Sequence, residues 1–178
     1  LISRLQEEGH QVTCLVPGGD SEAEAIRRYY DYMIRYENLF FDPELQDVTM
    51  THTGWDNYEY QCTSHKVSSY GEAGKIWMIL REKDYRKCIY LLNLCGQSED
   101  YWNEGKEEPN IQKDIKFTVQ VDTPVEKICF STPDGKNMDA VELLFTERAT
   151  RTGKFIDFTV PSLNYWTTIW IDTRKETI

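Results

Sequence analysis

The side chains most suited to acid–base chemistry in this chain are its carboxylates, which number 30 among 178 residues. Two pairs are close in sequence: Asp100 and Glu104 in a polar stretch, and Asp31 and Glu37 in a helical one. Two carboxylates that face each other across a substrate bond can act as acid and as nucleophile or base. A chain this acidic contains such carboxylate pairs by chance. Asp31, Arg35 and Glu37 are better explained as residues that hold the helix to its neighbours by ion pairs. We therefore expect no catalytic residue in this chain.

Other reactive side chains form no recognisable motif. A histidine, a serine and an acid could be combined, for instance His65, Ser64 and Asp56, but no nucleophile-elbow pattern surrounds them. The five cysteines are scattered without a C-x-x-C pair, and no phosphate-binding glycine loop is present. The sequence therefore predicts mostly free, buried thiols, no metal site and no cofactor.

Aromatic residues in polar surroundings are the candidates for ligand binding. Tyr101, Trp102 and Asn103 lie in a polar loop over residues 96–110, and Trp55 follows a glycine. Exposed aromatic rings can stack on sugar rings, and loops of this length are usually functional or specially packed. Alternatively, Trp102 folds back over the edge of the domain and Asn103 bonds the backbone of its own loop. Both interpretations remain open from the sequence.

Residues 20–42 have the pattern of one long amphipathic helix. Ser21 and Glu24 have the spacing of a capping box, and Pro43 disfavours the helical conformation at the residue before it. Apolar residues recur at roughly helical spacing along it, which indicates one broad apolar stripe: Ile26, Tyr29, Tyr30, Met33 and Phe40.

The chain after Pro43 reads as a series of short β-strands joined mostly by short turns. Residues 75–82 and 87–94 are apolar on both faces and predict a central hairpin. The fold class is therefore mainly β, an antiparallel two-sheet sandwich of Greek-key type preceded by one long helix. We expect an N-terminal segment with the helix over 1–42 and a sandwich domain over 43–178. The expected strands are 48–52, 58–62, 75–82, 87–94, 115–121, 125–131, 141–146, 155–160 and 165–171.

Charge limits the possible partners. The formal net charge is −10, which argues against nucleic acid and anionic membranes, whereas neutral sugars make no such demand. No apolar run approaches the roughly 18 residues of a membrane span. The chain starts at Leu1 and not at Met, so we expect it to be a piece of something longer.

Several segments resemble glycoside hydrolase family 66, the family of dextranases and cycloisomaltooligosaccharide glucanotransferases. The resemblance covers about residues 27–171, is weakest over 111–158, and depends on the order and spacing of its motifs. They are Arg28-Tyr29-Tyr30-Asp31, residues 35–39, Asp42-Pro43, residues 74–77, Arg81-Glu82, residues 91–94, Trp102-Asn103, Lys106, Pro109, Val160-Pro161, Leu163 and Tyr165-Trp166.

This resemblance implies the region after the catalytic barrel of a bacterial enzyme, secreted or in the cell envelope. Residues 1–42 would be the end of that barrel, and Ile26, Tyr29, Tyr30, Met33 and Phe40 would face it. The catalytic carboxylates of such an enzyme lie in the barrel, so none carries over to this chain.

Two functions follow as expectations. One is a non-catalytic accessory domain that supports the barrel of an enzyme acting on dextran-like α-glucan. The other is an autonomous carbohydrate-binding module for α-glucan, with Trp55, Tyr101, Trp102 and Asn103 as its binding residues. A fragment cut from its barrel would also expose the apolar helix stripe, which predicts either self-association through the helix or burial of the helix by residues 1–19 folding back.

Overall fold

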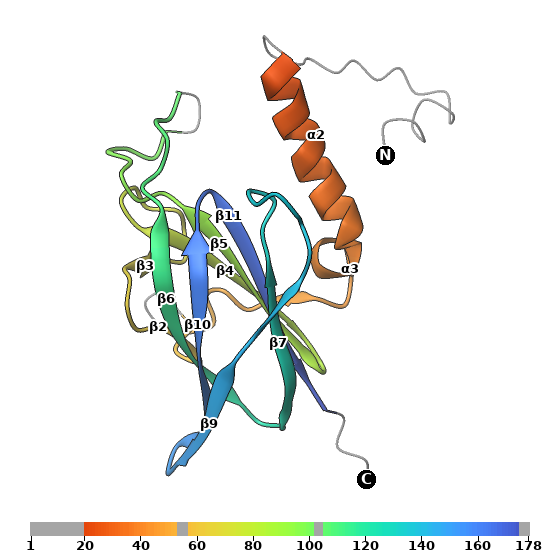
Figure 1. Ribbon diagram of the computed structural model, residues 1–178. Coiled ribbons are helices and arrows are strands. Elements are labelled where there is room, and N and C mark those ends of the chain that lie inside the picture. The colour runs from red at the N-terminus through yellow and green to blue at the C-terminus, as the bar shows by residue number, and fades with distance from the viewer. Residues whose placement is uncertain (1–19, 53–56, 102–104, 175–178) are drawn as a thin grey trace. The chain divides into compact units, whose positions relative to one another are not determined.

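The computed structural model describes residues 20–52, 57–101 and 105–174 (Figure 1). The chain divides into two compact units, Leu1–Tyr36 and Glu37–Ile178. Among the described residues, the first unit contains helix α2, and the second contains the short helix α3 and eleven strands. The mainly β, two-sheet architecture expected from the sequence is confirmed.

Helix α2 spans Asp20–Arg35. Three apolar side chains one turn apart are exposed along it: Ile26 by 41%, Tyr30 by 47% and Ile34 by 56%. Tyr29 and Met33 are half-buried, whereas Tyr32 is fully buried. Part of the predicted apolar stripe is therefore accessible in this chain. Within the described residues, no helix has the length and apolar character to cross a membrane.

The single helix expected over 20–42 is wrong in its length. Helix α2 ends at Arg35, and a separate helix α3 spans only Glu37–Phe40. Leu39 in α3 is 1% exposed, and the carbonyls of Leu39 and Phe40 accept side-chain hydrogen bonds from the sandwich. The last helical turn is therefore held by the sheet rather than continuing to Pro43.

Sheet A contains seven strands in the order β1-β4-β5-β11-β7-β8, with β3 paired in parallel to β4. The predicted central hairpin is β4–β5, whose register runs from Ile76↔Asn93 to Lys83↔Arg86. The strands are β1 (Gln46–Asp47), β3 (Val67–Ser68), β4 (Ile76–Lys83), β5 (Arg86–Asn93), β7 (Val125–Ser131), β8 (Val141–Leu143) and β11 (Trp166–Thr173).

Sheet B contains four strands in the order β2-β6-β10-β9, all antiparallel. Its longest pairing joins β6 and β10 from Val121↔Lys154 to Gln112↔Leu163. The strands are β2 (Tyr60–Cys62), β6 (Gln112–Val121), β9 (Phe145–Thr150) and β10 (Gly153–Leu163).

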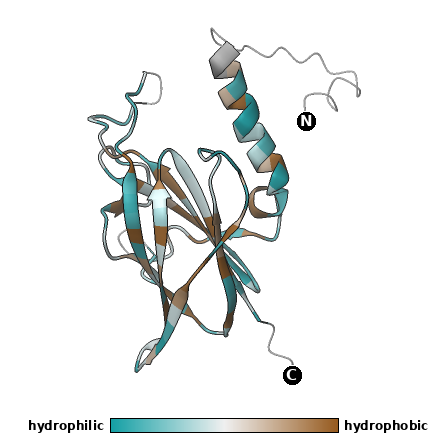
Figure 2. Cartoon of the chain, viewed as in Figure 1, coloured by the Kyte–Doolittle hydropathy of each residue, from teal (hydrophilic) through white to brown (hydrophobic). Residues whose placement is uncertain are grey.

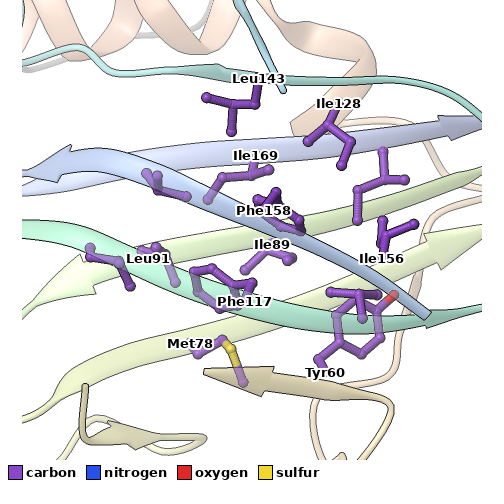
Figure 3. Close-up of a cluster of buried hydrophobic side chains, with 14 of the residues drawn as sticks. Tyr60, Met78, Ile89, Leu91, Phe117, Ile128, Leu143, Ile156, Phe158 and Ile169 are labelled. Atoms are coloured by element: carbon purple, nitrogen blue, oxygen red, sulfur yellow. The ribbon is translucent and has the colours of Figure 1, made fainter. Parts of the chain in front are cut away.

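The core lies between the inner faces of the two sheets (Figure 3). Apolar residues alternate along the strands because successive side chains of a strand point to opposite faces. Phe117 and Phe158 are register partners in sheet B, and their rings stack at 5.5 Å. Facing them from sheet A are Met78, Ile89, Leu91, Ile128 and Ile169.

Two expected strands differ from the structure. The alternating run at 48–52 is not a strand, and only Gln46–Asp47 pairs with β4. The segment after β1 is held instead by one side chain. The Thr49 hydroxyl accepts a hydrogen bond from Leu80 N and donates one to Leu80 O. The run at 141–146 is divided at Leu144 into β8 of sheet A and β9 of sheet B. Alternation alone predicts an extended chain but not which sheet it joins.

Hydrophobic and hydrophilic segments follow one another along the strands (Figure 2), and the outer face of sheet A carries large apolar side chains besides charged ones. Register places Trp77 opposite Leu92, and Leu92 opposite Trp166, on this outer side. Trp77, Leu92 and Trp166 are half-buried. A sheet face that meets only water is usually polar. Sheet A is therefore built to be covered on both sides.

Candidate functional site

Helix α3 is attached to the outer face of sheet A by three side chains, Arg81, Lys83 and Tyr90, here termed the α3 clip. Arg81 donates from Nη1 to Phe40 O at 3.0 Å and from Nη2 to Leu45 O at 2.9 Å. The Tyr90 hydroxyl donates to Leu39 O. The Lys83 ammonium donates to the Asp42 carboxylate. The clip therefore holds both ends of segment 39–45.

The clip follows from strand periodicity and from the end of the helix. Arg81 and Lys83 are two residues apart in β4 and so point to the same face of the sheet, while Tyr90 pairs with Ile79 on that face. The last carbonyls of any helix lack partners within the helix. The clip supplies partners for two of them, those of Leu39 and Phe40.

Apolar contacts complete the attachment. The Phe40 ring lies 5.6 Å from the Tyr90 ring and 5.2 Å from the Trp166 ring. Leu39 and Leu45 are 1% and 3% exposed. Phe40, which the sequence assigned to the helix stripe, thus contacts two aromatic residues of the sandwich itself.

Electrostatics keep the clip in its donating form. Burial raises the pKa of the Tyr90 phenol above its ordinary value, so its proton stays available for Leu39 O. The hydrogen bond from Lys83 lowers the pKa of Asp42, and the same bond raises the pKa of Lys83. Both partners are therefore ionised at neutral pH.

The long loop is anchored at its base by Asn93, which is 6% exposed. Its amide nitrogen lies 2.9 Å from Asn110 O, 2.7 Å from Asn164 O and 3.4 Å from Leu163 O. Its amide oxygen accepts from Cys95 N at 3.0 Å. Asn93 thus ties both ends of the loop to the β10–β11 turn.

The predicted sugar-binding residues are only partly described. Tyr101 is 63% exposed in the loop, and its backbone N–H donates to Glu99. Trp55, Trp102 and Asn103 lie outside the described residues. Tyr101 is thus the one predicted stacking residue whose exposure is known.

The candidate catalytic groups form no catalytic arrangement among the described residues. Asp31, Glu37 and Asp100 are exposed, and Glu104 and Asp56 lie outside the described ranges. The Ser64 hydroxyl lies 2.6 Å from His65 Nδ1 but also accepts the backbone N–H of Lys116, which gives it a structural role. No group of three or more His, Cys, Asp or Glu that could hold a metal ion occurs in the ranges that the structure covers.

The cysteines give a testable expectation. Cys62, Cys88, Cys95 and Cys129 are free, and burial raises the pKa of Cys88 to about 11. Thiol titration of the denatured, unreduced protein should therefore count at least four thiols. In the native protein Cys88, which is fully buried, should react last. A count of three or fewer would mean at least one disulfide among the five cysteines and would contradict the expectation.

Sequence reasoning missed the α3 clip. Arg81 and Lys83 lie in the charged end of a strand that begins with an apolar run, and a charged side chain in a covered sheet face needs a partner. The sequence therefore singles out these charged residues but does not show which groups they bind. The partners of Arg81 are backbone carbonyls and that of Lys83 is the Asp42 carboxylate, all about 40 residues earlier, and only the fold brings them near.

Comparisons with known proteins agree on one family. The sequence model of glycosyl hydrolase family 66 matches residues 20–170. Two cycloisomaltooligosaccharide glucanotransferases of Niallia circulans are 29% and 25% identical over 149 residues, which is 83% of this chain. The chain spans only 15% of the length of these relatives.

A solved structure shares the fold. It is a Paenibacillus cycloisomaltooligosaccharide glucanotransferase complexed with cycloisomaltoheptaose, with a TM-score of 0.72 at 21% identity. The match covers 85% of this chain and 21% of that one. This likeness supports the sandwich architecture.

Proposed function

This chain belongs to glycosyl hydrolase family 66, and we propose that it is a non-catalytic accessory domain of a larger enzyme acting on dextran-like α-glucan. Residues 43–178 would form its C-terminal sandwich, and residues 1–42 the end of a catalytic barrel. The accessory domain would cover the barrel wall and hold its shape. The substrate class is inferred from the names of the relatives.

The main support for this proposal is the outer face of sheet A. Three half-buried residues, Trp77, Leu92 and Trp166, stand where a water-facing sheet would be polar. Helix α3 covers part of this face and is held there by the α3 clip. Because α3 directly follows α2 in the chain, the clip would transmit the orientation of the sandwich to the preceding domain.

Helix α2 supports the same proposal independently. Its exposed apolar residues Ile26, Tyr30 and Ile34 lie at i, i+4 and i+8, on one side of the helix. Contiguous exposed apolar surface usually marks an interaction site. We propose that Ile26, Tyr29, Tyr30 and Met33 contact the catalytic barrel of the parent chain.

The second candidate is an autonomous α-glucan-binding module. The observation that favours it is the exposed ring of Tyr101 in the long loop. Such a module would bind glucan through the loop without a barrel next to it.

Activity measurements test the accessory role. The chain incubated with dextran should release no reducing ends, because no acid–nucleophile pair is assembled in its described residues. A dextranase serves as the positive control for the reducing-end assay. Turnover that disappears in an Asp100→Asn variant would show that the chain is itself an enzyme.

Self-association tests the interface on α2. If this surface belongs to a barrel, the isolated chain should associate through it, as measured by light scattering. The double variant Tyr30→Glu/Met33→Glu should then be monomeric at the same concentration. Glu24→Lys, a change of one exposed charge on the same helix, is the matched control. A monomeric wild type and an unaltered double variant would favour the autonomous module.

A further inference from the structure

A groove of about 710 Å³ lies where the chain passes from sheet A to sheet B. Strands β8 and β9 are the last strands of the two sheets, so neither has a further strand beside it among the described residues. We term this side of the sandwich the open edge. Both sheets line the groove, sheet A with Phe130 and residues 141–143, and sheet B with residues 116–118, Phe145 and residues 157–159. None of the lining residues belongs to helix α2 or to the α3 clip.

One apolar side chain protrudes beside the groove. Leu144 connects β8 to β9 and is 95% exposed, more than any other large apolar side chain in the described ranges. Val141 is exposed as well, whereas Phe130 and Phe145 are half-buried in the lining. The open edge therefore presents a protruding apolar side chain next to a hollow with apolar walls.

Two opposite charges stand on the two sides of this apolar patch. Successive side chains of a strand point to opposite faces, and Phe117 and Leu143 lie in the core (Figure 3). Lys116 therefore points outward from sheet B, and Glu142 points outward from sheet A. Both side chains line the groove and are exposed. Neither forms an ion pair with a described residue.

These features make the open edge complementary to itself. In a symmetric dimer both copies use the same patch, so a protrusion must meet a hollow and a charge must meet its opposite. A two-fold axis that runs along the open edge places sheet A of one copy beside sheet B of the other. We propose that the open edge binds a second copy of this chain, with Leu144 of each copy in the groove of the other. Glu142 of each copy then forms an ion pair with Lys116 of the other.

The alternative symmetric contact would join the sheets of two copies edge to edge. If β9 paired with its own copy about its middle, either Glu147 or Arg148 would face the same residue of the other copy. Like charges directly opposite each other destabilise a strand pair. The charges of the open edge thus favour the arrangement that brings Glu142 to Lys116. Because the contact is confined to one edge, we expect a weak dimer.

Sedimentation velocity of the complete 178-residue chain tests the dimer. Every sample carries Tyr30→Glu/Met33→Glu, so that association through α2 does not contribute. This background chain should form dimers as its concentration rises toward about 1 mM. Leu144→Asp should raise the dimer Kd at least about tenfold, and the exposure of Leu144 makes the change harmless to the fold. Lys154→Glu, which reverses an exposed charge elsewhere on β10, is the matched control and should leave the Kd unchanged.

Charge reversal tests which residues meet. Lys116→Glu places a glutamate opposite Glu142 of the other copy, and Glu142→Lys places a lysine opposite Lys116. Each variant alone should therefore be monomeric. A one-to-one mixture of the two variants should dimerise again, because each contact then joins a glutamate to a lysine. Both positions are exposed, so the changes leave the core intact.

Three results would overturn the proposal. One is a background chain that stays monomeric at about 1 mM. Another is a mixture of the two charge variants that stays monomeric although each variant is folded, which would mean that these positions do not meet between copies. The third is a dimer that persists unchanged in Leu144→Asp, which would place the contact elsewhere. The dextran assay and the α2 experiment involve none of these residues, so this proposal and the proposed function fail separately.

Discussion

Replacing Arg81 with alanine is expected to lower the free energy of unfolding of the sandwich unit by about 3–5 kcal/mol. Arg81 makes two hydrogen bonds to the carbonyls of Phe40 and Leu45, and each bond from a charged donor is worth about 1.5–3 kcal/mol. Without the guanidinium these carbonyls lose their side-chain donor beside Leu39 and Leu45, which are almost fully buried. The loss therefore combines lost bonds with poorly satisfied acceptors.

Urea unfolding followed by tryptophan fluorescence measures this loss, with Phe40 packed on Trp166 as a nearby reporter. Arg81→Lys keeps the charge but lacks the planar guanidinium whose two terminal nitrogens reach Phe40 O and Leu45 O, so it should recover only part of the stability. Arg151→Ala, an exposed arginine in a turn, should leave the midpoint unchanged. An Arg81→Ala protein within about 1 kcal/mol of the wild type would show that apolar contacts alone hold α3.

Replacing Asn93 with alanine is expected to cost about 3–4 kcal/mol and to release the base of the long loop. The Asn93 amide contacts the carbonyls of Asn110, Leu163 and Asn164 and accepts from Cys95 N. Each buried polar group left without a partner costs about 1–3 kcal/mol. An amide has only two hydrogens, so two of the three carbonyl contacts count fully.

Chemical unfolding gives the stability change, and hydrogen exchange of the backbone amides of residues 95–111 reports on the loop. Gln97→Ala is the matched control, because Gln97 makes an exposed bond to Glu107 O in the same loop. Its effect should stay within about 0.5 kcal/mol. Unchanged exchange in Asn93→Ala would mean that the loop is held elsewhere, for instance at the buried Pro109.

The sequence by itself predicted the elements that depend on local patterns. Continuous and alternating apolar runs predicted the central hairpin over 75–82 and 87–94 and the strand at 115–121, because strand period and burial are local properties. The structure has them as Ile76–Lys83, Arg86–Asn93 and Gln112–Val121. The motifs also identified the family. Together they predicted a two-sheet sandwich that the structure confirms.

Tertiary structure alone decided how those elements are joined. The pattern at 141–146 is one continuous strand in sequence, yet Leu144 divides it between two sheets because long-range pairing with β7 and β10 chooses the partners. The helix stops at Arg35, and the side chains that hold the following turn come from strands 40 to 50 residues later. Asp157, Arg148 and Thr118 are polar residues of three strands whose meeting depends on register. The periodicity of a strand predicts on which face of the sheet a side chain lies. Only the pairing of distant strands determines which other side chains it contacts on that face.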